Sequence, residues 1–153
     1  MGLWWVEEPR VLASSHPDES LLLELKRQGF RHVFSFLEPQ EQAANYDVSR
    51  LRPLGFSFYN LAVKDYTAPC QRQLEHFVDL MRGLTQEKVL LHCQGGKGRT
   101  GTFAAVYLIA FQAYLTQDAI SRVRLLQSGA IETIEQEQAI FKFAERSQDS
   151  PSI

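Results

Sequence analysis

The sequence has few of the features that mark several large classes of protein. Only two of its 153 residues are cysteines, Cys70 and Cys93, which is too few for a disulfide framework and indicates a reducing compartment where a thiol stays free. Lys and Arg number 16 and Asp and Glu 18, for a net charge of -2, so the basic excess that nucleic-acid binding needs is missing. We expect no nucleic acid among the partners, and any attraction for anions must be local.

Long hydrophobic runs are missing as well. No apolar stretch approaches the roughly 20 residues of a membrane span, and the segment from Met1 to Glu8 turns acidic before a signal-peptide core can form. Neither end carries a lipidation motif. These absences predict a soluble cytoplasmic protein with no membrane anchor, which we expect to be a monomer.

Apolar residues are plentiful, at 44% of the chain, which is enough for one domain with a core over residues 1–153. Short apolar runs bounded by turn residues predict strands at 11–12, 33–36, 56–63 and 89–91. Helical spacing between them predicts helices at 18–28, with Asp18 as cap and Gly29 as stop, near 43–51, and around 74–81. This alternation of strands and helices indicates a mainly parallel sheet.

The last third of the chain is predicted to be helical, with helices at 103–111, 118–126 and 133–143 and a polar tail from about 146. The fold class is therefore α/β, with a small, mainly parallel central sheet flanked by helices. Ligands bind at the carboxyl ends of the strands in such sheets. The loops after Val63 and Leu91 should open on the same side, which brings Asp65 close to Cys93.

The segment from His92 to Gly101, HCQGGKGRTG, follows a predicted buried strand and opens an apolar helix. Its three inner glycines allow positive φ angles that turn successive N–H groups toward one centre, which creates an anion nest at a helix N-terminus. A phosphate dianion fits such a nest. We assign phosphate binding to Gln94, Gly95, Gly96, Lys97, Gly98 and Arg99.

Two side chains give this loop its predicted chemistry. Arg99 carries a planar fork that can grip two phosphate oxygens. The nest, the helix dipole and Arg99 all favour the thiolate of Cys93 over its thiol, which makes Cys93 a nucleophile at neutral pH.

The residues of this loop also allow other interpretations. Gly96 to Gly101 is a literal G-x-G-x-x-G, the dinucleotide-binding pattern, but that site also needs an acidic residue about 20 positions on, where Ser121 to Arg124 lie in a helical pattern. A Walker loop needs Ser or Thr after Gly-Lys, and Gly98 stands there. A buried, inert cysteine in a glycine turn is the simplest alternative.

The chain resembles the cysteine-dependent protein tyrosine phosphatase superfamily, specifically its compact atypical dual-specificity members of the VH1-like Z type and their archaeal relatives. The resemblance rests on the His92 to Gly101 signature, the Asp65 loop, and the segment GAIETIEQE from Gly129 to Glu137. It implies hydrolysis of phosphotyrosine, with some phosphoserine or phosphothreonine, on protein or peptide substrates. The implied reaction passes through a phosphocysteine and uses no metal and no cofactor.

The resemblance also assigns roles to residues outside the loop. Asp65 aligns with the general acid that protonates the leaving group; the alternative for a lone loop Asp is a turn or helix cap. The relatives usually carry Pro before this Asp, and Lys64 stands here, which leaves the rigidity of the loop open. Thr100 aligns with the hydroxyl that eases departure of the Cys93 sulfur, or is simply a helix-start Thr. His92 is expected to organise the loop.

The hydrolytic water has two candidate ligands, Glu132 and Gln136. Glu132 occupies the position where several relatives have Gln, and Gln136 lies one helical turn farther on, so both could face the pocket and orient the water. The alternative is that Glu132 caps the last helix by its charge and Gln136 is solvated.

Three further alternatives concern substrate, activity and redox state. Lys97 is similar to a loop lysine of phosphoinositide phosphatases, which makes a phosphoinositide or another small phosphomonoester the alternative substrate; a solvated loop lysine is the plainer interpretation. A non-catalytic phosphoprotein binder is the competing class. Cys70 either protects Cys93 as a disulfide or is a packing cysteine at a helix start.

Overall fold

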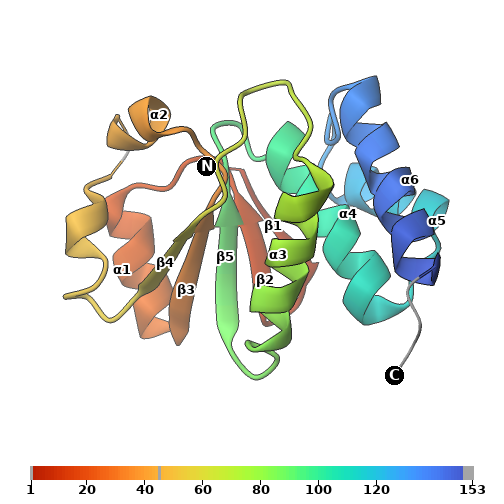
Figure 1. The fold of residues 1–153 in the computed structure, drawn as a ribbon. Coiled ribbons are helices and arrows are strands. Elements are labelled where there is room, and N and C mark those ends of the chain that lie inside the picture. Colours follow the sequence, from red (N-terminus) through yellow and green to blue (C-terminus); the bar gives the residue numbers. More distant parts are fainter. Residues whose placement is uncertain (1, 45, 150–153) are drawn as a thin grey trace.

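A five-stranded sheet runs through the middle of the molecule. The structure is a computed structural model that describes residues 2–44 and 46–149. The strand order is β1-β2-β5-β3-β4 (Figure 1). Strands β2, β5, β3 and β4 are parallel, and β1 pairs antiparallel with β2 at the edge. The predicted mainly parallel α/β sheet is therefore confirmed. The strands are β1 (Leu3–Glu7), β2 (Val11–Ser14), β3 (Phe30–Ser35), β4 (Ser57–Asn60) and β5 (Lys88–His92).

Helices cover both faces of this sheet (Figure 1). One face carries α1 (Glu19–Arg27), α2 (Pro39–Ala43) and the short 3-10 helix η1 (Val48–Arg50). The opposite face carries the other four helices: α3 (Gln71–Arg82), α4 (Gly98–Gln112), α5 (Thr116–Leu126) and α6 (Ile134–Asp149). Within the described residues, no helix is both long and apolar enough to cross a membrane.

Aromatic packing fixes α4 against the sheet. The rings of Phe36 and Phe103 stack with centroids 4.0 Å apart and an interplanar angle of 3°. Phe77 of α3 meets both rings edge-on. All three side chains are fully buried, and such aromatic pairs contribute about 0.5–1.5 kcal/mol beyond their buried area. The start of α4, which bears Arg99, is thereby held at the carboxyl end of β5.

The start of α1 follows the sequence prediction. The Asp18 side chain accepts a hydrogen bond of 2.8 Å from the N–H of Leu21, and Gly29, with φ of +96°, follows the C-cap. Capping of this kind stabilises a helix by about 1 kcal/mol.

The prediction and the structure differ most in four segments. Strand β1 was not expected; Trp4 and Val6 are buried on one side of an edge strand whose other side is partly open. A helix near 43–51 is wrong, because Glu38 and Pro39 start α2 earlier and Asp47 caps the separate η1. The strand expected at 56–63 is confined to β4. Residues 146–149, where a polar tail was expected, continue α6, and the rest of that tail lies outside the described residues.

Candidate active site

The phosphate loop connects the end of β5 at His92 to the start of α4 at Gly98. Cys93 is 2% exposed, and its Sγ accepts a hydrogen bond of 3.3 Å from the N–H of Gly96. Of the three inner glycines, for which positive φ angles are expected, Gly96 adopts one, at +72°. A Cβ on Gly96 would lie 2.6 Å from the backbone nitrogen of Ser15. The loop can therefore take this shape only with glycine at position 96.

Neighbouring segments hold the loop through its carbonyl groups. Trp4 Nε1 donates to the carbonyl of Gly96 at 3.1 Å. The backbone N–H of His16 donates to Gln94 at 3.0 Å, and that of Ile131 donates to Lys97 at 3.2 Å. These bonds come from β1, the connection after β2 and the segment before α6. Because the N–H of a trans peptide unit points away from its carbonyl, the N–H groups that share a peptide unit with these three carbonyls face the inside of the loop.

His92 is buried behind the loop as a neutral ring. Burial lowers its pKa to about 3; the hydrogen bond to the Cys93 carbonyl opposes this shift, and the positive charge of Arg99 adds to it. The Tyr46 hydroxyl lies 2.7 Å from His92 Nε2, and burial raises the pKa of Tyr46, which keeps the phenol protonated. The Cys93 carbonyl, 3.4 Å from Nδ1, can only accept a hydrogen bond, which assigns the ring hydrogen to Nδ1 and makes the Tyr46 hydroxyl the donor to Nε2. This geometry suits a group that organises the loop. Both ring nitrogens have partners, so neither is free to take a proton from the substrate.

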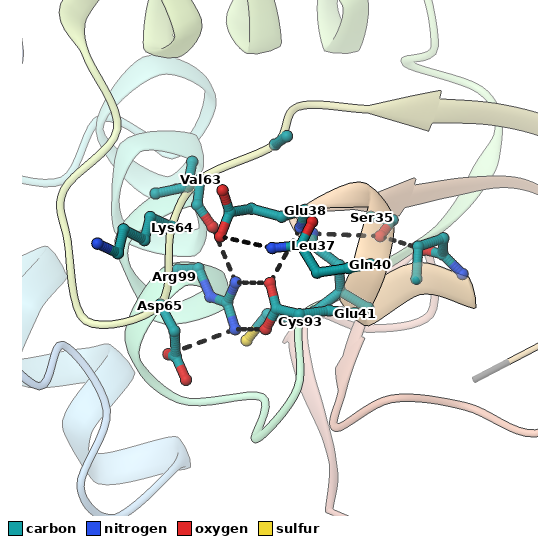
Figure 2. Close-up of polar contacts among 12 residues, drawn as sticks. Ser35, Leu37, Glu38, Gln40, Glu41, Val63, Lys64, Asp65, Cys93 and Arg99 are labelled. Atoms are coloured by element: carbon teal, nitrogen blue, oxygen red, sulfur yellow. Dashed lines mark hydrogen bonds and ion pairs between the residues drawn. The ribbon is translucent and has the colours of Figure 1, made fainter. Parts of the chain in front are cut away.

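Arg99 is at the centre of the site (Figure 2) and is 1% exposed. Its Nη1 donates to Glu41 Oε2 at 2.9 Å and to the carbonyl of Val63 at 2.8 Å, and its Nη2 donates to Glu41 Oε1 at 3.0 Å. Asp65 Oδ1 lies 3.3 Å from Nη2. Burial disfavours the charge, but Glu41, Cys93 and Asp65 outweigh it and raise the pKa of Arg99. Arg99 Nε has no hydrogen-bond partner among the described residues, so this nitrogen can take a phosphate oxygen.

Glu41 is a site residue that the sequence argument missed. It comes from α2, where Glu38 and Glu41 form a capping box. The hydrogen bond from Arg99 lowers the pKa of Glu41, which keeps the carboxylate charged. A sequence signal existed in Glu38-Pro39-Gln40-Glu41, a helix-start pattern directly after the carboxyl end of a predicted strand. The helix predicted at 43–51 left Glu41 outside any element.

Asp65 lies in a tight turn whose ends are bonded. The N–H of Thr67 donates to the carbonyl of Lys64 at 3.0 Å, and Thr67 Oγ1 donates to the same oxygen at 2.6 Å. The Asp65 carboxylate accepts from the N–H of Tyr66 at 3.0 Å and is 47% exposed. The structure thus places Asp65 next to Arg99 of the phosphate loop. Lys64, which stands where the relatives carry Pro, supplies the acceptor that closes the turn.

Two further predicted residues, Glu132 and Gln136, adjoin the start of α4. Glu132 is exposed, and a Cβ on Gly98 would collide with its carboxylate. Gln136 is fully buried, in contrast to the solvated alternative. Its amide lies beside the same glycine, since a Cβ there would be 3.1 Å from Gln136 Nε2.

The remaining candidates are placed as follows. Thr100 is fully buried in the first turn of α4, and its Oγ1 has no hydrogen-bond partner within the described ranges. The Lys97 side chain reaches toward Gly129, where a Cβ would lie 3.8 Å from Nζ. Cys70 is exposed, caps the start of α3, and is a free thiol like Cys93. Among the residues that the structure describes, no three His, Cys, Asp or Glu side chains are grouped to hold a metal ion.

A Cys-x5-Arg loop between a central parallel strand and a helix defines a cysteine-dependent phosphatase domain. Residues 2–140 match the model of the PTP-SAK family, described as "Swiss Army Knife protein, DSP-PTPase phosphatase domain", and the chain belongs to that family. The resemblance to compact dual-specificity phosphatases is confirmed.

Curated relatives of the chain are longer proteins. "Protein tyrosine phosphatase domain-containing protein 1" of Mus musculus is 29% identical over 147 residues, which cover 84% of this chain and 20% of that protein. "Dual specificity protein phosphatase CDC14AB" of Danio rerio is 31% identical over 86 residues, 56% of this chain and 14% of that protein. The chain thus spans a fifth or less of the length of these relatives.

Solved structures match nearly the whole chain. The active form of Tk-PTP has a TM-score of 0.87 and 29% identity, and the match covers 94% of this chain and 97% of Tk-PTP. PTPMT1 in complex with PI(5)P has a TM-score of 0.85 and covers 95% and 96% of the two chains. At 20% identity, the likeness to PTPMT1 shows the fold alone.

Proposed function

We propose that this domain hydrolyses phosphotyrosine, and also phosphoserine and phosphothreonine, in protein or peptide substrates through a phosphocysteine on Cys93. The observation that carries the proposal is the contact of Cys93 Sγ with the Gly96 N–H. It supports a loop whose N–H groups converge on the sulfur, where they stabilise a thiolate and an incoming phosphate alike. The proposed enzyme acts in the cytoplasm as a monomer and without metal or cofactor.

In the first step, the loop N–H groups and Arg99 bind the phosphate. The Cys93 thiolate attacks phosphorus, the S–P bond forms, and the bond from phosphorus to the leaving oxygen breaks. Asp65 gives its proton to that oxygen. The 3.3 Å contact between Asp65 and Arg99 supports this role, because a group beside the arginine that grips the phosphate is within reach of the leaving group. Proton donation of this kind contributes about 10²–10⁴-fold to the rate.

In the second step, water attacks phosphorus and the S–P bond breaks, which regenerates the thiolate and releases inorganic phosphate. The Asp65 carboxylate accepts the proton of the water. The Thr100 hydroxyl, which has no partner within the described residues, donates to the departing sulfur. Glu132 orients the water: its carboxylate lies against Gly98, while the first turn of α6 is capped by Thr133, whose Oγ1 accepts from the Gln136 N–H at 3.1 Å.

A phosphoinositide is the second candidate substrate, because PTPMT1 shares the fold and its solved structure holds PI(5)P. Lys97 is the loop residue that would favour it. Two observations support the phosphoprotein instead: the Lys97 side chain reaches toward Gly129, and the Glu41 carboxylate already offsets the charge of Arg99. Additional phosphate groups of a polyphosphorylated headgroup would meet that carboxylate unfavourably.

Hydrolysis of p-nitrophenyl phosphate tests this proposal. We expect turnover that a chelator leaves unchanged and that vanadate inhibits competitively. Phosphotyrosine peptides should be better substrates than a short-chain phosphatidylinositol monophosphate at equal concentration. Binding of the phosphopeptide without any turnover would instead identify a non-catalytic binder, and chelator-sensitive activity restored by a divalent ion would overturn the mechanism.

A further inference from the structure

We propose that Gln136 is a positioning residue that holds the Asp65 turn in place, and that it does not orient the hydrolytic water. The inference rests on the proposed role of Asp65 as general acid. It concerns a side chain that the family signature of the phosphate loop does not include and that lies 37 positions beyond Arg99 in the chain.

The hydrogen bonds of Gln136 account for most of what its amide can do. Its Oε1 accepts from the N–H of Glu132 at 2.8 Å and from the N–H of Thr133 at 3.2 Å. Its Nε2 donates to the carbonyl of Thr67 at 3.1 Å. An amide oxygen has two lone pairs, and both are used by backbone groups. A side chain that is fully buried and bonded in this way has no acceptor left with which to hold a nucleophilic water.

The same bonds join three segments at the site. Gln136 belongs to the first turn of α6, its Oε1 fixes the backbone just before that helix, and its Nε2 reaches the Asp65 turn. Beside it lies Gly98, the first residue of α4, where a side chain would crowd Nε2. The absence of a side chain at position 98 therefore lets this amide bridge α6 and the Asp65 turn directly next to the phosphate loop.

The Asp65 turn needs support from outside because little of it is buried. Asp65 is 47% exposed and Tyr66 is 63% exposed, and Tyr66 has a φ of +64°, which is unfavourable for a large side chain. Before the turn, the backbone of Val63 is fixed on both sides, by the Phe36 carbonyl and by Arg99. After the turn, the carbonyl of Thr67 is fixed by Gln136. Asp65 is thus suspended between two anchors, one of which is this glutamine.

Loss of the second anchor should change one chemical event. A general acid must lie within hydrogen-bond reach of the leaving oxygen, and a displacement of about 1 Å can cost much of its contribution. The thiolate, the loop N–H groups and the bonds from Arg99 to Glu41 and Val63 do not involve the displaced residues. The loss should therefore grow as the leaving group becomes more dependent on a proton.

The matched pair Gln136→Glu and Gln138→Glu tests this inference. A carboxylate at position 136 can still accept from the Glu132 and Thr133 N–H groups, but at neutral pH it cannot donate to the Thr67 carbonyl. Gln138 lies on the same helix, is exposed, and adds the same charge. The measurement is kcat/KM for a series of aryl phosphates from p-nitrophenyl to phenyl phosphate, because kcat/KM reports formation of the phosphoenzyme and not its hydrolysis.

For Gln136→Glu we expect kcat/KM to fall about tenfold for phenyl phosphate and less than about twofold for p-nitrophenyl phosphate. The dependence on leaving-group basicity should become steeper and the basic limb of the pH profile flatter. Gln138→Glu should match the wild type. Placed in an Asp65→Asn background, Gln136→Glu should have little further effect on phenyl phosphate, because two changes that act through one group are not additive.

An unchanged leaving-group dependence in an active Gln136→Glu enzyme would overturn the inference. If the phosphoenzyme also accumulated in that variant, Gln136 would instead be a water-orienting residue. Methionine has a similar length and no amide, so Gln136→Met must give the same steeper dependence of kcat/KM on leaving-group basicity. A uniform loss of kcat/KM across the series would show a merely structural role. These outcomes are separate from failure of the proposed function, which would appear as a wild-type protein that does not hydrolyse p-nitrophenyl phosphate.

Discussion

Replacement of His92 by glutamine should reduce the sensitivity of the fold to mild acid. In the folded protein, burial lowers the pKa of His92 to about 3, from an ordinary value of 6.5. Below pH 6.5 the unfolded chain takes up a proton that the folded protein does not, so the stability that depends on the neutral ring is lost progressively as the pH falls toward 3. Each unit corresponds to about 1.4 kcal/mol, which gives a loss of about 2 kcal/mol at pH 5.

Denaturant unfolding at several pH values between about 5 and 7 measures this loss. The wild type should lose about 2 kcal/mol more over that interval than His92→Gln, whatever the stability of the variant at neutral pH. The window stays above the range where carboxylates such as Glu41 titrate. His32→Gln is the control and should keep nearly the wild-type slope. Burial lowers the pKa of His32 as well, but Glu87 opposes that shift. Equal slopes for the wild type and His92→Gln would refute the argument that His92 is buried as a neutral ring.

Three further predictions concern the site. Gly96→Ala should lower the melting temperature and abolish protection by vanadate in thermal unfolding, because positive φ costs about 1–2 kcal/mol for other residues and the new Cβ would overlap Ser15. The control is Gly83→Ala, at a helix end with φ of -79°. An unaltered vanadate shift in Gly96→Ala would contradict the loop geometry. Asp65→Asn should lower kcat/KM about 10²-fold or more for phenyl phosphate, with a much smaller loss for p-nitrophenyl phosphate; equal losses of kcat/KM for both substrates would point to a structural role. Glu132→Ala should slow hydrolysis of the phosphoenzyme so that it accumulates in rapid-quench experiments, and a lowered melting temperature with no accumulation would identify a helix cap.

The overall architecture could be predicted because its signals are local. The helix spacing of Leu74, Phe77, Val78 and Met81 identifies α3, and the apolar run before Cys93 identifies β5. Strand β1 was missed because its identity depends on a tertiary contact. The rest of the molecule buries Trp4 and Val6 on one side of the strand. The local sequence, which ends in two glutamates, indicates only an acidic N-terminal segment.

The site was predictable where residues lie on one loop or follow a strand at the same sheet edge. Cys93, Arg99 and Asp65 meet because parallel strands end at a common edge. Glu41 was not found, since its part in the site is a bidentate bond to an arginine 58 positions later. Gln136 was named for its spacing, but the bond from its Nε2 to a backbone carbonyl 69 positions earlier leaves no trace in the pattern of side chains.

The attack of Cys93 on phosphorus is tested most directly by a burst experiment at substrate saturation. A burst of p-nitrophenol equal to the enzyme concentration is expected in Glu132→Ala, together with one phosphate bound to Cys93 as identified by mass spectrometry of acid-quenched enzyme. Cys93→Ser, whose hydroxyl does not ionise at neutral pH, should still bind phosphopeptide but show neither burst nor turnover. Turnover by Cys93→Ser, or phosphate recovered on any other residue of the quenched enzyme, would contradict the proposed mechanism.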